Sequence, residues 1–131
     1  MKPKIIEIDS FGKPGDGVLT VAVIQKDIPY EVKRIVWIYG VEDSKERGNH
    51  ANLDTIQTFF VLNGNIKVSL TNEDGIEEVF ELSKKNQGLV VPPNYWRTLV
   101  FSEDAILLVL NSHDYEETDY VRDIQDFLIQ K

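Results

Sequence analysis

The residues most able to do chemistry lie in the stretch 47–68, where His50, Asn52 and Gln57 follow one another at the spacing of a metal-ligand motif. A metal site of that spacing carries histidines and a glutamate, and a further histidine where this chain has Arg97. Arginine stays protonated and only donates hydrogen bonds, so it cannot ligate a cation. One imidazole and two neutral amides are a weak set for zinc, iron or manganese. The sequence therefore predicts a pocket without a metal.

His50 is instead suited to acid–base catalysis, because an imidazole with a pKa near ~6.5 accepts and returns a proton at neutral pH. Asn52 can donate a hydrogen bond to a substrate oxygen, but a carboxamide cannot take a proton from carbon. Gln57 either holds an oxygen in the same way or completes a buried polar network. We expect His50 and Asn52 to act in catalysis, with Gln57 binding substrate.

Three arginines are candidates for binding an anionic group. The chain carries a net charge of −8, so a phosphate ligand requires a local cluster of cations, and the guanidinium fork suits phosphate oxygens. We assign this role to Arg34, Arg47 and Arg97. The alternatives are exposed ion pairs for Arg34 and Arg47, and for Arg97 a structural pairing with a buried acid.

Aromatic residues near these positions could contact a base or a sugar ring. Trp37 and Tyr95 are predicted to bind substrate by stacking, although core packing is the ordinary role of such side chains. Tyr39 is a candidate proton donor, with Tyr95 as the alternative. His113 is interpreted as a loop histidine.

The elements that must position these residues are short β-runs separated by turns. Asn-Gly and Asp-Gly pairs at 63–64 and 74–75 are typical of tight hairpins, and the segment 11–17 is predicted to be a loop. Nine or ten such runs without helical periodicity predict an all-β sandwich or small barrel. From Thr118 onward the spacing of apolar residues changes to that of a short C-terminal helix.

Composition limits the remaining possibilities. A chain of 131 residues is predicted to form a single domain, 1–131. It has no cysteine, which excludes disulfides and thiolate chemistry. The acidic balance opposes binding to nucleic acid or anionic membranes, and no segment has the length and apolar character of a membrane span. A soluble, cytoplasmic protein is expected.

Four segments resemble a known family: Lys33-Arg34-Ile35, Arg47-Gly48-x-His50-Ala51, the turn 92–96, and the tail 115–122, YEETDYVR. The chain resembles the small cupin dTDP-4-keto-6-deoxyhexose 3,4-ketoisomerases and the related WxcM-like domains of lipopolysaccharide synthesis. The resemblance implies a cupin-type double-stranded β-helix, or jelly-roll barrel. It also implies a dTDP-linked keto-deoxysugar as substrate, no cofactor, and a homodimer that exchanges its N-terminal strands.

The chain departs from that family pattern at two positions. Asn52 stands where the family usually has a second histidine, and Arg97 where it has another histidine. Three hypotheses follow: a ketoisomerase acting through an enediol for surface polysaccharide synthesis, an epimerase on the same substrate class, and a catalytically inactive sugar-nucleotide binder or partner subunit.

Overall fold

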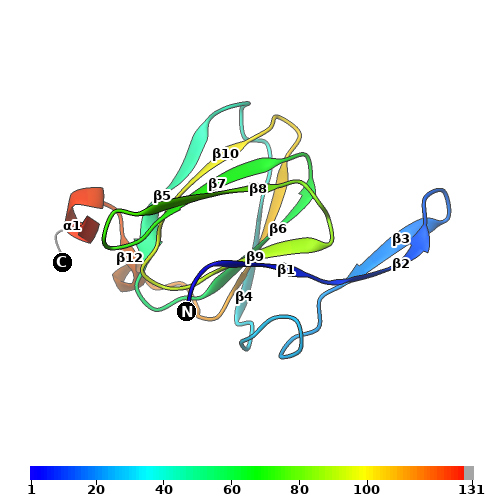
Figure 1. The fold of residues 1–131 in the computed structure, drawn as a ribbon, viewed down its shortest axis with the longest axis horizontal. Coiled ribbons are helices and arrows are strands. Elements are labelled where there is room, and N and C mark those ends of the chain that lie inside the picture. Colours follow the sequence, from blue (N-terminus) through cyan, green and yellow to red (C-terminus); the bar gives the residue numbers. More distant parts are fainter. Residues whose placement is uncertain (129–131) are drawn as a thin grey trace.

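The computed structural model describes residues 1–128, which form two five-stranded antiparallel sheets and a separate hairpin (Figure 1). The first sheet has the order β1 (Lys4–Glu7), β9 (Gln87–Val91), β6 (Gln57–Asn63), β11 (Ile106–Asn111), β4 (Arg34–Ile38). The second has the order β12 (Tyr120–Val121), β5 (Glu46–Asn52), β10 (Trp96–Phe101), β7 (Ile66–Thr71), β8 (Glu77–Leu82).

The two sheets enclose one apolar core. Side chains alternate between the faces of a strand, so the inward positions of β6 and β7 contribute residues such as Phe59, Val61, Val68 and Leu70, all at most 2% exposed. Phe101 from β10 joins the same cluster. The prediction of an all-β jelly-roll barrel is confirmed.

The segment 11–17 is part of a hairpin, so its prediction as a loop was wrong. Strand β2 (Asp9–Lys13) pairs with β3 (Gly17–Val21), and only the tip between them is a turn. The glycines and the proline, taken as signs of a loop, instead shape this turn. The hairpin extends away from the barrel (Figure 1), and its side chains Phe11 and Leu19 are 59% and 62% exposed.

The C-terminal segment is only partly helical. A 3₁₀ turn (Glu117–Asp119) leads into β12, and the helix α1 covers Ile124–Leu128. The helix expected from Thr118 therefore begins later. Asp119 does not cap it, because its carboxylate is buried against Asn52 and Thr55. No helix within residues 1–128 is long and apolar enough to cross a membrane.

Candidate functional site

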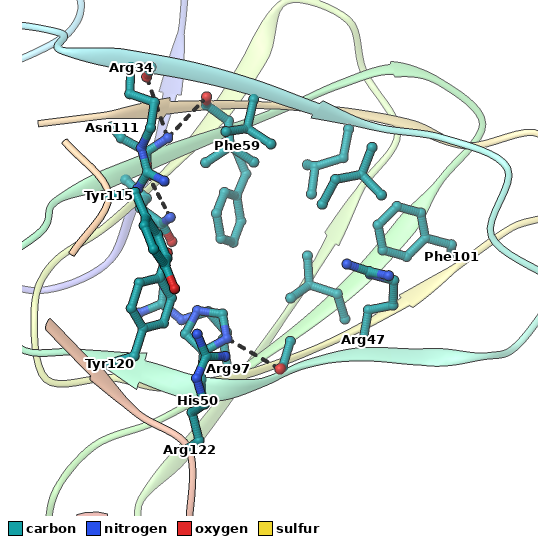
Figure 2. Close-up of a pocket in the computed structure, with 17 residues that line it drawn as sticks. Arg34, Arg47, His50, Phe59, Arg97, Phe101, Asn111, Tyr115, Tyr120 and Arg122 are labelled. Carbon is teal, nitrogen blue, oxygen red and sulfur yellow. Dashed lines mark hydrogen bonds between the residues drawn. The ribbon is translucent and has the colours of Figure 1, made fainter. Parts of the chain in front are cut away.

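A cavity of about 380 Å³ opens between the two sheets at the end of the barrel that the C-terminal segment covers (Figure 2). Strands β4, β5, β6, β10 and β11 line it, together with residues from the tail. Apolar side chains, among them Phe59, Val109 and Phe101, form part of its lining. A cavity of this size that combines apolar walls with converging polar groups is typical of a small-molecule site.

His50 is turned into this cavity by an irregularity of β5. Gly48 has φ +91° and Asn49 has φ +55°, both in the left-handed region, and the ladder with β10 shifts register between Arg97 and Thr98. A Cβ at Gly48 would lie 2.9 Å from the carbonyl oxygen of Arg97, so only glycine fits. Such a bulge re-aims the side chain that follows it, which here is His50.

The His50 ring is oriented by one hydrogen bond and leaves one nitrogen free. Nδ1 lies 3.2 Å from the carbonyl oxygen of Gly48, and since a carbonyl only accepts, Nδ1 carries the proton. Nε2 is buried without a partner among the described residues. Burial, followed by the charge of Arg97, lowers the pKa of His50 to about 4, against the opposing effects of the Gly48 carbonyl and the Asn52 side chain. At neutral pH, Nε2 therefore presents an unprotonated lone pair.

A chain of amides links two arginines across the cavity. Arg97 donates through Nη1 to Gln57, and Gln57 Nε2 donates to Asn111 Oδ1 over 2.7 Å. Arg34 Nη2 lies 3.5 Å from the same Asn111 oxygen. The expectation that Arg97 pairs with a buried acid is not met by a direct bond, because its hydrogen-bond acceptors are Gln57 and the carbonyl of Tyr95. The charge of Asp119 still acts on the guanidinium, since it opposes the lowering of the Arg97 pKa by burial.

The cavity is strongly cationic although the protein is acidic. Arg34, Arg47, Arg97 and Arg122 line it, and its lining contains no aspartate or glutamate among the described residues. Arg97 is 1% exposed, and burial lowers its pKa to about 10, so it remains charged at neutral pH. Arg34 is half-buried, whereas Arg47 and Arg122 are exposed, and Arg122 is paired with Glu117 over 2.7 Å. Guanidinium groups that converge on a cavity favour an anionic ligand such as a diphosphate.

The C-terminal segment closes one side of the cavity with a series of tilted aromatic rings in contact. Arg34 lies 5.7 Å from the Tyr115 ring centroid, and the Tyr115 and Tyr120 centroids are 5.5 Å apart. The Tyr120 ring is 5.0 Å from that of His50, and Arg122 lies 4.5 Å from the Tyr120 centroid. Such contacts combine aromatic packing with cation–π attraction.

The structure brings together five of the predicted site residues: Arg34, Arg47, His50, Gln57 and Arg97 all line the cavity. Sequence reasoning assigned no role to four others that line it: Asn111, Tyr115, Tyr120 and Arg122. Three of these belong to the tail motif that carries the family resemblance, which was the available signal for them.

Four predicted site residues lie elsewhere. Trp37 and Tyr39 are on the outer side of β4 or just beyond it, 60% and 68% exposed, because Arg34, Val36 and Ile38 occupy the inward positions. Tyr95 packs against the apolar core outside the cavity lining. Asn52 is fully buried, and its amide donates to Asp119 over 2.9 Å.

The donor set of the cavity does not fit a metal ion. Among the described residues that line it, His50 is the only imidazole, and the other polar side chains are amides, phenols and guanidinium groups, of which the last cannot ligate. Within residues 1–128, no three histidine, cysteine, aspartate or glutamate side chains gather as a ligand cluster.

The fold and site define a jelly-roll barrel with a cationic pocket built around one histidine. The model of the WxcM-like, C-terminal family matches residues 1–131, and the chain belongs to this family. It is 35% identical over 112 residues to the TDP-4-oxo-6-deoxy-alpha-D-glucose-3,4-oxoisomerase of Aneurinibacillus thermoaerophilus, an alignment that covers 85% of this chain and 80% of that protein.

Solved structures of similar proteins share the whole fold. QdtA, a sugar 3,4-ketoisomerase from Thermoanaerobacterium thermosaccharolyticum solved in complex with TDP, has a TM-score of 0.93 and 32% identity, covering 98% of this chain and 93% of its own. WlaRA, a TDP-fucose-3,4-ketoisomerase from Campylobacter jejuni, has a TM-score of 0.90 and 31% identity, covering 100% and 96%. The cupin-type fold expected from the sequence is confirmed.

Proposed function

We propose that this protein is a sugar-nucleotide 3,4-ketoisomerase, which converts a TDP-4-keto-6-deoxyhexose into the corresponding 3-keto sugar without a metal. The observation that carries the proposal is His50, which lines a cavity together with four arginines and whose Nε2 has no hydrogen-bond partner among the described residues. The family and its ketoisomerase relatives supply the reaction class.

In this proposal His50 is the base that acts on carbon. The proton at C3 is acidic because it is α to the C4 carbonyl, and Nε2 removes it to give an enediolate. Arg97, buried beside His50, stabilises the negative charge that develops on oxygen. Return of the proton to C4 completes the move of the carbonyl to C3.

The remaining cationic residues suit the nucleotide. Arg34 and Arg47 line opposite parts of the cavity (Figure 2), and Arg122 lies at its rim on the tail. We assign the diphosphate to Arg34 and Arg47, and Gln57 to holding Arg97 in place. The 380 Å³ cavity is small for a whole TDP-sugar, so part of the nucleotide extends beyond it.

The test is incubation with TDP-4-keto-6-deoxyglucose in D2O, followed by NMR of the sugar protons, for the wild type and the His50→Ala variant. We expect deuterium at the exchanging carbons and a 3-keto sugar, both lost in His50→Ala, with TDP affinity retained. Deuterium at C5 without a 3-keto product would replace the proposal with an epimerase.

One observation favours a second candidate function, a catalytically inactive sugar-nucleotide binder or partner subunit. Asn52 occupies the position of the usual second histidine, and its amide is bound to Asp119 rather than facing the cavity. In the same experiment, measurable TDP binding with no exchange at any carbon would support this binder and refute the enzyme.

We further propose a homodimer. Two surfaces expose large apolar side chains: the β2–β3 hairpin with Phe11 and Leu19, and the outer face of β4 with Ile35 and Trp37, more than a monomer ordinarily leaves in water. Strand β1 pairs with β9 of its own chain, so we assign the exchange to the hairpin. Trp37→Lys should shift the mass measured by light scattering from two chains to one.

We place the protein as a single domain in the cytoplasm, where its product would enter surface polysaccharide synthesis. Sugar nucleotides are the activated donors of such polymers, and the lack of cysteine fits a reducing compartment. Loss of a deoxysugar from the surface polysaccharide of a deletion strain, restored by the wild-type gene and not by His50→Ala, tests this placement.

A further inference from the structure

The proposed isomerisation moves two protons, and His50 accounts for only one of them. A proton passes between carbons C3 and C4, and a second passes between the oxygens O3 and O4. Asn52 is not available for the second task, since its Nδ2 donates to Asp119 Oδ2 and its side chain is absent from the cavity lining. Another group must therefore serve the oxygens.

Few residues of the cavity can exchange a proton. Arginine is a poor proton carrier because its guanidinium does not give up its proton in proteins. Among the described residues the lining includes no carboxylate, and its other titratable residues are His50, Tyr115 and Tyr120. The Tyr115 hydroxyl donates to Glu117 Oε1 at 2.5 Å. The Tyr120 hydroxyl has no hydrogen-bond partner in residues 1–128, so it is free to meet a ligand.

Tyr120 is also held where the oxygens of a substrate at His50 would lie. It pairs with Asn52 in the β12–β5 ladder, two positions along β5 from His50, and the two rings are 5.0 Å apart. Arg122 lies over its ring at 4.5 Å and is also paired with Glu117 over 2.7 Å. The Tyr120 ring is therefore fixed between His50 and Arg122 at the side of the cavity.

We propose that Tyr120 is the second catalytic acid–base residue, which carries the proton between O4 and O3 of the substrate. As Nε2 of His50 takes the C3 proton, the C–H electrons form a C3–C4 double bond and O4 becomes negative. The Tyr120 hydroxyl protonates O4, and the resulting phenolate takes the proton from the O3 hydroxyl. The C3 carbonyl forms, C4 recovers the proton from His50, and both side chains return to their starting states.

In this scheme Asn52 helps to position Tyr120 through its hydrogen bond to Asp119. Asp119 is 6% exposed and accepts bonds from Asn52 Nδ2 at 2.9 Å, the Asp54 amide at 2.6 Å and the Thr55 hydroxyl. The Leu53 amide donates to the Asp119 carbonyl at 2.8 Å. These bonds anchor the residue immediately before Tyr120, so Asn52 acts on the chemistry through the placement of the phenol.

This inference rests on the proposed function, and the Tyr120→Phe variant separates the two. The variant removes one hydroxyl without a protein partner, so TDP affinity and the unfolding midpoint should match the wild type. In D2O, we expect His50-dependent deuterium exchange at C3 to persist, because enolisation needs only the base. Formation of the 3-keto sugar should fall by about 100-fold or more, the usual cost of losing a general acid–base group.

Three outcomes would overturn the assignment. Product formation in Tyr120→Phe within about threefold of the wild type would show that the hydroxyl is not needed. Equal losses of exchange and product would place Tyr120 in the carbon step or in folding. Absence of both reactions in the wild type would instead remove the proposed function, and this inference with it. Tyr39→Phe, whose ring lies outside the barrel, is the matched control and should retain both activities.

Discussion

The buried, neutral state of His50 predicts a specific loss of stability in acid. The folded protein holds the pKa of His50 at about 4, through burial and the nearby charge of Arg97, against 6.5 for the free side chain. Between these values the unfolded chain binds a proton that the folded chain does not. Stability therefore rises with pH across this window: the full value is present above pH 6.5 and declines as the pH falls to about 4.

The size of the effect follows from the same two values. With pKa values of 6.5 in the unfolded chain and about 4 in the folded chain, linkage predicts that His50 lowers the free energy of unfolding at about pH 4.5 by ~2.5 kcal/mol. Because the His50 ring borders the open cavity, solvent reduces this, and we expect about 2 kcal/mol. Other ionisable groups also contribute in acid, so the total change in stability is not diagnostic.

The assay is a double difference that isolates His50. Urea denaturation of the wild type and of His50→Gln at pH 7 and at about pH 4.5 gives four unfolding free energies. We expect the wild type to lose about 2 kcal/mol more than His50→Gln on acidification. Identical losses in the two proteins, or an NMR titration of His50 with a midpoint near ~6.5, would refute the reasoning.

Three other substitutions test the site. Arg97→Met should move the pKa of His50 upward from about 4, because it removes a nearby cation; an NMR midpoint unchanged at about 4 would contradict this. Asp119→Asn should cost about 2–4 kcal/mol in urea denaturation, since three donors lose a buried charged acceptor; a loss under about 0.5 kcal/mol would show that the anchor is dispensable. Gly48→Ala should lower kcat more than it lowers TDP affinity, because the added methyl group would shift His50. Gly15→Ala is the control, since Gly15 has a similar φ of +93° with open space around it, and it should leave kcat unchanged. Equal effects of the two variants on kcat would argue against a role for the contact between Gly48 and the Arg97 carbonyl.

The local pattern along single strands was enough to locate much of the site. His50 and Arg47 follow from the motif on β5, and Arg34 points inward on β4. The same alternation puts Trp37 and Tyr39 on the opposite side of the strand, since both lie at odd distances from Arg34. Their predicted roles were based on residue type, and the structure places both outside the cavity lining.

The structure of the C-terminal tail could not be predicted from its local sequence pattern. The spacing of Val121, Ile124 and Leu128 predicts a helix, and Asp119 has the residue type of a helix cap. In the folded chain Asp119 instead meets Asn52 and Thr55 on a distant segment. That bond competes successfully with capping because it satisfies a buried carboxylate with several donors.

The sequence by itself determined the all-β jelly-roll class, the family, the histidine and most of the arginines of the pocket, because strand alternation and turn residues are local properties of the chain. Only the tertiary structure decided that Asn52 turns to Asp119 and that Tyr115, Tyr120 and Arg122 close the cavity. Those contacts join segments more than sixty residues apart, as the 67-residue separation of Asn52 and Asp119 shows. Which of several polar partners a buried amide meets depends on how the whole barrel closes, and no local pattern encodes that choice.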